Sequence, residues 1–457
     1  MRHSLDADYL VVGAGASGLA FTDSLIDHAD AEVVIVDRRH GPGGHWLDAY
    51  PFVRLHQASV FYGVASTELG DGTIQPDGPE AGLHERASAP EICAYYARAL
   101  DRMVRTGKVR FFPECDYLGD GRFRSRVSGD EYDVRLRGRV VDAHYREPDI
   151  PATTPPPFAV AEPARVVPVG QLVSIDRAPP RYVVVGSGKT ATDAIIWLLG
   201  NGLDPDRIVW VRPRDPWMLN RAVVQPDPAI FTGMVADILE SAAAASSLPD
   251  FFLRLEAAGV MLRIDRDVEP TMARTPTLAQ WELDLLRSIE NVVRLGHIRG
   301  VEAGAIELDQ GRVPIARDAV VVHCAAAGLR DVPAVPVWGS DGITVQPIRS
   351  GFPCFGAALS GYVEATRSTD EEKNKVCPSS PFPDSLAAWA RMTVLGGRAA
   401  AAFGAESDIN DWAQRCLLNP SRVAPEHRER PEVVSALERL GAHGPAGMAR
   451  LAELASV

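Results

Sequence analysis

Two segments of the chain share one pattern of apolar and polar positions: a short apolar run, a glycine-rich turn and then a helical periodicity. The first segment, YLVVGAGASGLA, begins at Tyr9, keeps helix-compatible spacing to Ile26, and is followed by the apolar run EVVIV. The second, RYVVVGSGKTATDAIIWLL, repeats this order from Arg181, and RIVWV follows at 207–211. Each segment therefore predicts a strand, a tight turn, a helix and a second strand.

The small residues in both turns have the spacing of a dinucleotide-binding loop. Such a loop turns sharply and lets the backbone approach a pyrophosphate, while the start of the helix offers unpaired N–H groups to the anion. The residues at the three positions are Gly13, Gly15 and Gly18, then Gly186, Gly188 and Ala191. The run GKT at 188–190 is not a nucleoside-triphosphate loop, because Val183 stands where that loop requires glycine. The alternative is two purely structural strand–helix turns.

The second strand of each segment ends in a different charge. Asp37 follows the first, whereas Arg212 and Arg214 follow the second. A carboxylate suits a free ribose, and arginines suit a 2′-phosphate. We therefore expect FAD at the first loop and NADPH at the second. A salt bridge between Arg214 and Asp215, or simple exposure of the arginines, is the alternative.

Proline and helix patterns organise the rest of the chain. Prolines are dense between 148 and 180, which predicts a crossing linker. The segments with a helical pattern are 90–104, 227–258, 277–289, 384–404 and 430–455. A buried-strand pattern returns at 318–329, which we interpret as the chain crossing back into the first domain.

These patterns predict an α/β protein with two Rossmann-like dinucleotide-binding domains, the NADPH domain inserted in a discontinuous FAD domain. The expected boundaries are 1–150 for the first part of the FAD domain, 151–180 for the linker, 181–317 for the NADPH domain with a helical insertion, 318–405 for the second part of the FAD domain and 406–457 for a C-terminal helical segment.

Composition excludes several classes of function. The 457 residues carry a net charge of −13, which argues against nucleic acid or an anionic membrane as a partner. No stretch approaches the roughly 20 apolar residues that span a bilayer, and the polar N-terminus does not resemble a secretory signal. The six cysteines are scattered without a Cys-x-x-Cys pair. We expect a cytoplasmic protein with reduced thiols and no metal site, and the sequence leaves its oligomeric state open.

The segment after the first loop, GPGGHWLDAYPFVRLHQASVFYG, resembles the class B flavoprotein monooxygenases, which include flavin-containing, Baeyer–Villiger and N-hydroxylating enzymes. The matching positions are Gly43, Gly44, Trp46, Tyr50, Pro51, Arg54, Ser59 and Tyr62. The second loop, GSGKTATDA with Asp193, is also similar to that family's second fingerprint. The resemblance covers roughly 5–220 well and 318–400 loosely, and 227–290 matches no known pattern.

Three departures leave the subfamily open. The family's Phe-x-Gly-x-x-x-His fingerprint is absent from PPFAVAEPARVVP, which precedes the second loop. His56 stands where Baeyer–Villiger enzymes have an aspartate, and DAH at 142–144 replaces Ala-Thr-Gly.

The resemblance implies that the segment 43–62 lies against a flavin ring. The residues expected to contact FAD or NADPH are Gly13, Gly15, Ser17, Gly18, Asp37, Arg38, Gly44, Trp46, Gly186, Ser187, Gly188, Lys189, Thr190, Arg212 and Arg214. His45, His56 and Gln57 are the candidate catalytic groups, because a flavin peroxide adduct needs hydrogen-bond donors and shielding from water. A histidine also exchanges protons near neutral pH. Satisfying backbone groups in a tight loop is the alternative role for both histidines, and simple packing is the alternative for Trp46.

The expected activity is that of an FAD-dependent, NADPH-consuming monooxygenase that inserts one oxygen atom into a small organic substrate by way of a flavin peroxide adduct. One alternative is an NAD(P)H:acceptor flavin oxidoreductase without oxygenation, and another is a non-enzymatic flavoprotein-like binding module. A disulfide reductase is excluded, because no cysteine pair follows the first helix. The substrate is not indicated, and its pocket is expected from 227–290 and 346–385.

Overall fold

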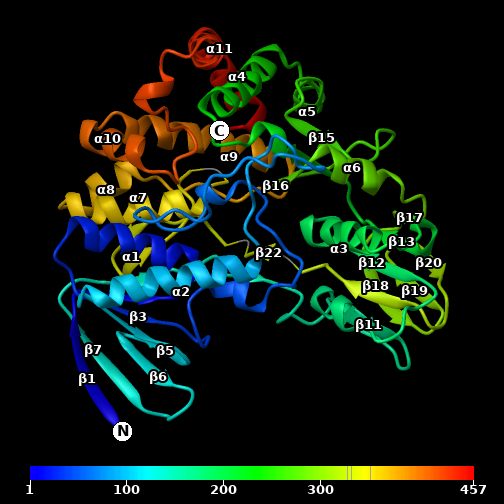
Figure 1. Ribbon diagram of the computed structural model, residues 1–457, viewed down its shortest axis with the longest axis horizontal. Helices are drawn as coiled ribbons and strands as arrows, with labels where there is room; N and C mark the ends of the chain where they lie inside the picture. The colour runs from blue at the N-terminus through cyan, green and yellow to red at the C-terminus, as the bar shows by residue number, and fades with distance from the viewer. Residues whose placement is uncertain (327, 331, 350) are drawn as a thin grey trace.

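The computed structural model describes residues 1–326, 328–330, 332–349 and 351–457. It contains two α/β units side by side, with a layer of helices across one end of both (Figure 1). The middle of the chain forms the second unit, and segments before and after it form the first. The expected fold class, with one Rossmann-like unit inserted in another, is confirmed.

The first unit is built on a six-stranded sheet of order β23-β24-β8-β2-β3-β4, in which only β23 is antiparallel to its neighbour. The strands are β2 (Tyr9–Val12), β3 (Val33–Val36), β4 (Val109–Phe112), β8 (Val140–Asp142), β23 (Trp338–Gly339) and β24 (Gly342–Thr344). The helices are α1 (Ala16–His28), α2 (Ala89–Arg105), α7 (Pro353–Thr366) and α8 (Asp370–Val376). α2 matches the helix expected at 90–104.

Alternation along the strands places the two faces of this sheet in different cores. Val11 and Ile35 pack with the residues of α1 and α7, whereas Leu10 and Val34 pack with a smaller sheet. That four-stranded sheet has the order β1-β7-β6-β5. Its strands are β1 (Arg2–Ala7), β5 (Cys115–Gly119), β6 (Arg122–Ser125) and β7 (Glu131–Leu136).

The second unit repeats this plan around a five-stranded parallel sheet of order β11-β21-β12-β13-β17. The strands are β11 (Arg165–Pro168), β12 (Tyr182–Val185), β13 (Ile208–Val211), β17 (Val292–Val293) and β21 (Val320–His323), and the helices are α3 (Lys189–Gly200) and α6 (Gln280–Arg287). The other face packs against a second four-stranded sheet. Its strands are β10 (Ala159–Val160), β18 (Ile298–Glu302), β19 (Ala305–Leu308) and β20 (Gly311–Pro314).

Two sequence-based expectations about the crossings are wrong. β11 falls within the expected linker 151–180 but pairs with β21 in the second sheet. β21 lies within 318–329, where a return to the first domain was expected, yet it sits between β11 and β12. An apolar run shows that a strand is buried on both faces but not which sheet it joins. The chain re-enters the first sheet only at β23, after β22 (Gly328–Leu329) pairs with β9 (Pro148–Asp149) where the two crossings meet.

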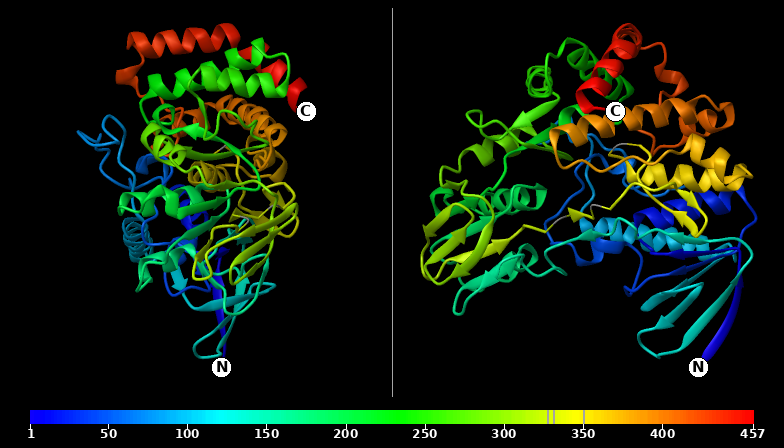
Figure 2. Two further views of the ribbon diagram at one scale, coloured as in Figure 1. Left: turned by 90° about the vertical axis from the view of Figure 1, so that its right-hand side faces the viewer. Right: turned by 180° about the vertical axis from the view of Figure 1, so that it is seen from behind.

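The helical layer combines the expected insertion with the C-terminal segment. Its helices are α4 (Pro228–Ala244), α5 (Leu248–Ala257), α9 (Leu386–Gly404), α10 (Ser407–Arg415) and α11 (Pro431–Ala455). α4 and α11 run side by side in every view, joined by ion pairs of Arg439 with Asp237 and Glu240 (Figure 2). The layer meets the second unit through β14 (Pro216–Asn220), β15 (Met261–Arg263) and β16 (Met272–Leu278). The short 3-10 helices are η1 (Gly44–Asp48), η2 (Ser59–Phe61), η3 (Val169–Ser174), η4 (Pro205–Arg207), η5 (Arg221–Val223) and η6 (Pro425–His427).

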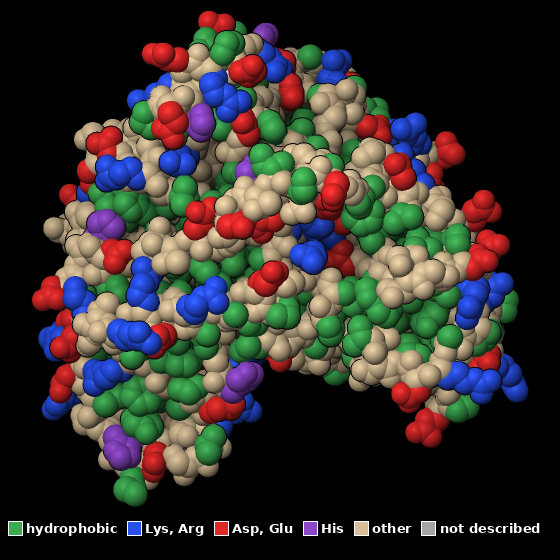
Figure 3. All heavy atoms as spheres, viewed as in Figure 1, with side chains coloured by type: hydrophobic (Ala, Val, Ile, Leu, Met, Phe, Trp, Pro, Cys, Tyr) green, Lys and Arg blue, Asp and Glu red, His purple; other side chains and the backbone are tan. Residues whose placement is uncertain are grey.

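The surface carries both signs of charge. Acidic and basic side chains are interspersed over the face seen in Figure 3, without a patch of one sign. In the described part of the chain, no helix has both the length and the apolar composition needed to cross a membrane.

Candidate functional site

The first glycine loop leaves β2 and enters α1 as the sequence predicts. An added Cβ at Gly18 would lie 2.0 Å from the Gly13 carbonyl oxygen, so helix and turn touch backbone to backbone. The helix begins after Gly15 without a side-chain cap, which leaves N–H groups of its first turn free for an anion. Ser17 lies in that first turn. Gly44 faces this loop, because an added Cβ on it would lie 3.1 Å from the Gly15 Cα.

Asp37 holds the first loop in shape. Its Oδ2 accepts a hydrogen bond from the Ala14 amide at 2.6 Å, and its Oδ1 accepts one from the Arg39 amide at 2.8 Å. Each carboxylate oxygen keeps a further lone pair for a ribose hydroxyl. Arg38 pairs with Glu147 at 2.6 Å, so its expected contact with a cofactor competes with an existing ion pair.

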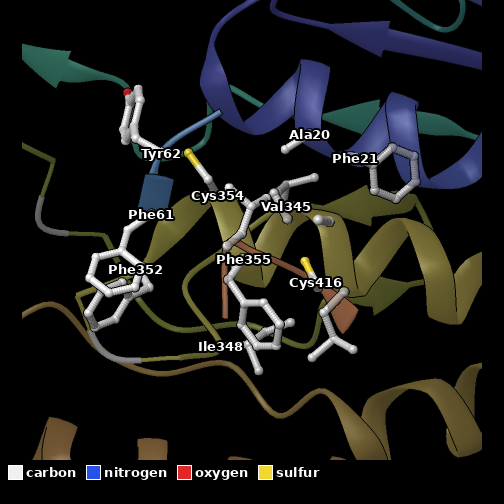
Figure 4. Close-up of a cluster of buried hydrophobic side chains, with 14 of the residues drawn as sticks. Ala20, Phe21, Phe61, Tyr62, Val345, Ile348, Phe352, Cys354, Phe355 and Cys416 are labelled. Atoms are coloured by element: carbon white, nitrogen blue, oxygen red, sulfur yellow. The ribbon is translucent and has the colours of Figure 1, made fainter. Parts of the chain in front are cut away.

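The segment 43–62, which resembles the flavin loop of the class B enzymes, is closed by aromatic contacts. The Trp46 indole N–H donates to the Tyr62 hydroxyl at 2.7 Å, and Trp46 is 8% exposed. Trp46 therefore ties the two ends of the segment together. Tyr62 and Phe61 lie beside Cys354 and Phe352 at the start of α7, in one buried cluster (Figure 4).

His45 and His56 are both neutral in this structure. Burial, reinforced by the Arg39 cation, lowers the pKa of His45 to about 4. Burial and the nearby cations, Lys189 first, lower the pKa of His56 to about 3. These pKa values contradict the expectation that one of the histidines exchanges protons near neutral pH. The reason is that the loop is more enclosed than its polar sequence indicates. Gln57 is half-buried beside His56.

These two pKa shifts predict that acid weakens the fold. At pH values above 6.5, the ordinary pKa of histidine, both groups are neutral in the folded and in the unfolded chain. There they do not make the free energy of unfolding depend on pH. Below that value the unfolded chain binds protons that the folded chain does not, which costs about 1.4 kcal/mol per histidine and pH unit. His56→Gln should therefore lose about 2 kcal/mol less stability between pH 7 and pH 5 than the native chain, as measured by urea unfolding. The exposed His40→Gln serves as the control, and an equal loss in both variants would contradict the assignment.

The second loop has the same construction and an open approach. An added Cβ at Gly186 would lie 3.0 Å from the Cys324 carbonyl oxygen, whereas no atom lies within 4 Å of that position at Gly188. α3 begins after Gly188 without a side-chain cap. Ser187 and Lys189 are buried, and the Lys189 ammonium pairs with Asp193 one turn along the helix. Thr190, next in the helix, lies near the Tyr50 hydroxyl, whose pKa burial and the Asp193 carboxylate raise well above its usual value.

Arg212, at the end of β13, combines burial with unused hydrogen-bonding capacity. Its guanidinium is 1% exposed, pairs with Asp215 at 2.8 Å and lies 4.6 Å from the Trp210 ring centre. Its Nε and Nη1 atoms have no hydrogen-bond partner within the described residues. Burial lowers the pKa of Arg212 to about 10. Asp215 therefore pairs with Arg212, and not with Arg214 as the alternative interpretation held.

A cavity of about 360 Å³ opens beside this guanidinium. Its lining residues are Arg212, Ile264, Asp265, Arg266, Leu286, Arg287, Ile289 and Val292. Arg214 is not among them, and it lies near the half-buried Arg274. Of the two arginines singled out in the sequence, only Arg212 reaches this cavity.

One segment connects the two loops. The Tyr50 hydroxyl, within 43–62, donates to Asp193 Oδ2 of α3 at 2.7 Å. The same segment touches the first loop at Gly15 through Gly44. The segment 43–62 therefore contacts both the first loop and the helix that follows the second loop.

Sequence reasoning missed a buried group of charged residues behind His56. Arg221 is fully buried and pairs with Glu80 and Glu282, each at 2.6 Å, and Arg86 pairs with Glu80 at 2.8 Å. These residues belong to no motif and are distant in the chain. Among the described residues, no group of three or more His, Cys, Asp or Glu side chains could hold a metal ion.

Comparison with known proteins places the chain in a family. A family model described as an NAD(P)-binding Rossmann-like domain matches residues 11–63. The uncharacterized protein Rv2000 of Mycobacterium tuberculosis (strain ATCC 25618 / H37Rv) is 42% identical over 453 residues, which cover 96% of this chain and 84% of that protein. The uncharacterized protein Mb2023 of Mycobacterium bovis has the same identity and coverage.

Among solved structures, the polycyclic ketone monooxygenase from the fungus Thermothelomyces thermophila is similar with a TM-score of 0.51 and 11% identity, over 100% of this chain and 89% of that one. At this identity the likeness concerns the fold alone. The chain belongs to the family of these uncharacterized mycobacterial proteins, and its fold is similar to that of the polycyclic ketone monooxygenase.

Proposed function

We propose that this protein is an FAD-dependent, NADPH-consuming monooxygenase that inserts one oxygen atom into a small organic substrate, with molecular oxygen as co-substrate, in the cytoplasm. The observation that carries the proposal is the segment 43–62, which contacts the first loop through Gly44 and the helix of the second loop through Tyr50. A flavin at the first loop and a nicotinamide at the second would meet beside this segment. FAD reduced by NADPH activates oxygen, and the protein contributes binding, orientation and electrostatics.

The residues of the first loop fit FAD. The free N–H groups at the start of α1 suit a pyrophosphate, and the close contact of Gly18 with Gly13 leaves the backbone open to it. Asp37 suits the ribose, and Gly44 covers the loop from the other side. This assignment gives FAD to the first unit and NADPH to the second.

The residues of the second loop fit NADPH. Gly188 leaves room at the start of α3 for the pyrophosphate, next to Lys189 and Thr190. The unpartnered Nε and Nη1 of Arg212 suit a 2′-phosphate. The aliphatic walls of the cavity beside Arg212 suit the adenine ring.

The candidate catalytic groups would act as neutral hydrogen-bonding groups. His56 Nδ1 is buried without a partner among the described residues, so it is free to bond to a bound flavin or substrate. A neutral imidazole offers one N–H donor and one lone pair, and Gln57 beside it offers an amide. His45 is neutral as well, and its ring centre lies 5.1 Å from the ring centre of Trp46. The enclosure of this segment also excludes water from the reacting atoms.

Anaerobic reduction followed by oxygen tests the proposal. We expect purified protein to be yellow, to bleach with NADPH in the absence of air, and to recover its oxidised absorbance with a delay after an oxygen pulse. Immediate recovery would favour an oxidoreductase without oxygenation. A colourless protein that takes up no FAD would favour a binding module and overturn both enzymatic assignments.

The structure predicts which arginine distinguishes NADPH from NADH. Arg212→Ala should raise the KM for NADPH by roughly 10- to 100-fold, the value of one or two charge-assisted hydrogen bonds, with a much smaller change for NADH. Asp215 keeps a partner in this variant, because Arg294 also pairs with it at 2.9 Å. Arg214→Ala is the matched control and should change little. Equal losses for NADPH and NADH in Arg212→Ala would remove the phosphate assignment.

A further inference from the structure

Arg221 anchors the segment that carries His56. It lies in η5, between β14 and α4 in the chain, and it is 0% exposed. Its Nε donates to the His56 carbonyl oxygen at 3.1 Å. Its two terminal nitrogens pair with Glu80 Oε1 and Glu282 Oε2, each at 2.6 Å. Because the guanidinium is planar and forked, these contacts fix the direction of the Nε–H bond.

A second donor supports the same carbonyl group. Thr277, at the end of β16, donates its hydroxyl to the His56 carbonyl oxygen and also accepts a hydrogen bond from Arg221 Nε at 3.2 Å. The backbone of His56 is therefore held from outside the first unit. The imidazole Nδ1 is buried and has no hydrogen-bond partner among the described residues, so it adds nothing to these backbone contacts.

Glu282 connects this anchor to the second loop. Its Oε1 lies 3.8 Å from Nζ of Lys189, the first residue of α3, while its Oε2 pairs with Arg221. Burial alone would raise the pKa of Glu282, but Lys189, Arg221 and Arg86 together lower it to about 2, so the carboxylate is ionised. One buried carboxylate is thus shared between the start of α3 and the anchor of His56.

Glu80 is the second carboxylate that pairs with Arg221, and it comes from a long segment of the first unit. Residues between η2 and α2 cross from the first unit toward β16 and α6, as the lighter blue trace in Figure 1 shows. There Glu80 Oε1 accepts a hydrogen bond from the Trp281 indole at 3.0 Å and pairs with Arg221. Arg221 therefore has a carboxylate on each side, and removing one leaves the other in place.

We propose that Arg221 and Glu282 are positioning residues that fix the backbone of His56. Through Lys189 they also couple the position of His56 to the nucleotide bound at the second loop. The inference rests on the proposed function. A pyrophosphate at the start of α3 competes with Glu282 and Asp193 for the Lys189 ammonium. Glu282 then keeps Arg221 at 2.6 Å and Arg86 at 4.0 Å as its near cations, and the donor to the His56 carbonyl group shifts as Glu282 moves toward them. Occupancy of the second loop is in this way communicated to His56.

Hydrogen exchange tests the anchor without relying on activity. In FAD-loaded protein, Glu282→Gln should raise amide exchange in the segment 52–60 by about tenfold and abolish the change that NADP⁺ causes there in the native chain. Glu256→Gln is the matched control, because it breaks a pair with Arg263 at 2.7 Å in the helical layer. Unchanged exchange of 52–60 in Glu282→Gln would overturn the inference.

The same experiment distinguishes failure of the proposed function from failure of the proposed role of Glu282. If the native chain shows no NADP⁺ binding, the proposed cofactor is wrong, while the comparison without nucleotide still decides whether Glu282 anchors the segment. If Glu282→Gln does not fold, Arg221→Lys replaces it, because lysine keeps the charge but lacks the Nε donor. We expect the same tenfold rise in that variant, and its absence would overturn the anchor.

A double-mutant cycle separates positioning from general stability. If Glu282 acts through His56, then Glu282→Gln should lower kcat in the native background by about tenfold but have no further effect in His56→Ala. FAD content should be unchanged in all four proteins. Additive losses in the cycle would show that Glu282 acts elsewhere and would overturn the inference.

Discussion

Gly18→Val should abolish FAD retention, and even Gly18→Ala should severely weaken it. The added Cβ would lie 2.0 Å from the Gly13 carbonyl oxygen, a distance that backbone atoms cannot tolerate. Either the turn opens or α1 moves away from β2, and both changes remove the N–H groups from their common direction.

α1 has no room to retreat. On its other side it meets α7 so closely that an added Cβ at Gly361 would lie 2.2 Å from the Phe21 carbonyl oxygen. The strain therefore falls on the turn itself. We expect Gly18→Ala to fold with a free energy of unfolding lowered by about 1–3 kcal/mol, as for overpacked cores.

Flavin absorbance relative to protein absorbance, measured after purification and after incubation with excess FAD, gives the result. Gly41→Ala is the matched control, because Gly41 lies in the same region, with no atom within 4 Å of its Cβ position. It should stay fully yellow. A folded Gly18→Ala that binds FAD as tightly as the native chain would contradict the role of the first loop.

The sequence was most informative where the cause of structure is local. Both glycine loops, the helix α2 and the long helices α9 and α11 follow from spacing, prolines and periodicity within a few turns. The placement of β21 does not, because its valines contact both faces of whichever sheet it joins. Only the pairing of Val320 and Val322 with β11 and β12 decides that the sheet is the second one.

The residues of the candidate site also differ in how far the sequence could predict them. Asp37 could be found because it lies at the end of the strand after a glycine loop. Arg212 and Arg214 could not be told apart, since both lie beyond the end of β13, where the regular alternation of a strand no longer fixes the direction of a side chain. Arg221 and Glu282 give no signal at all, because each is a common surface residue type that becomes a buried partner of His56 only through tertiary contacts.

His56→Ala should lower kcat for substrate oxygenation by roughly 10²- to 10³-fold, the usual loss when one positioned hydrogen-bond donor is removed from an active site. FAD content should not change, because the proposed contacts with the FAD pyrophosphate come from the first loop, which does not include His56. The neutral amide of His56→Gln can still donate and accept one hydrogen bond each, so we expect it to recover part of the loss.

The pH profile separates the two possible roles of His56. Burial and the Lys189 cation hold the pKa of His56 at about 3, so its ionisation should leave kcat unchanged between pH 5.5 and 8. The native chain and His56→Gln should therefore show parallel profiles in that range, although their rates differ. A limb near pH 6.5 that is present in the native chain and absent from His56→Gln would mean that the bound cofactors restore an ordinary histidine pKa. His56 would then act as an imidazolium acid, against the neutral role that its burial predicts.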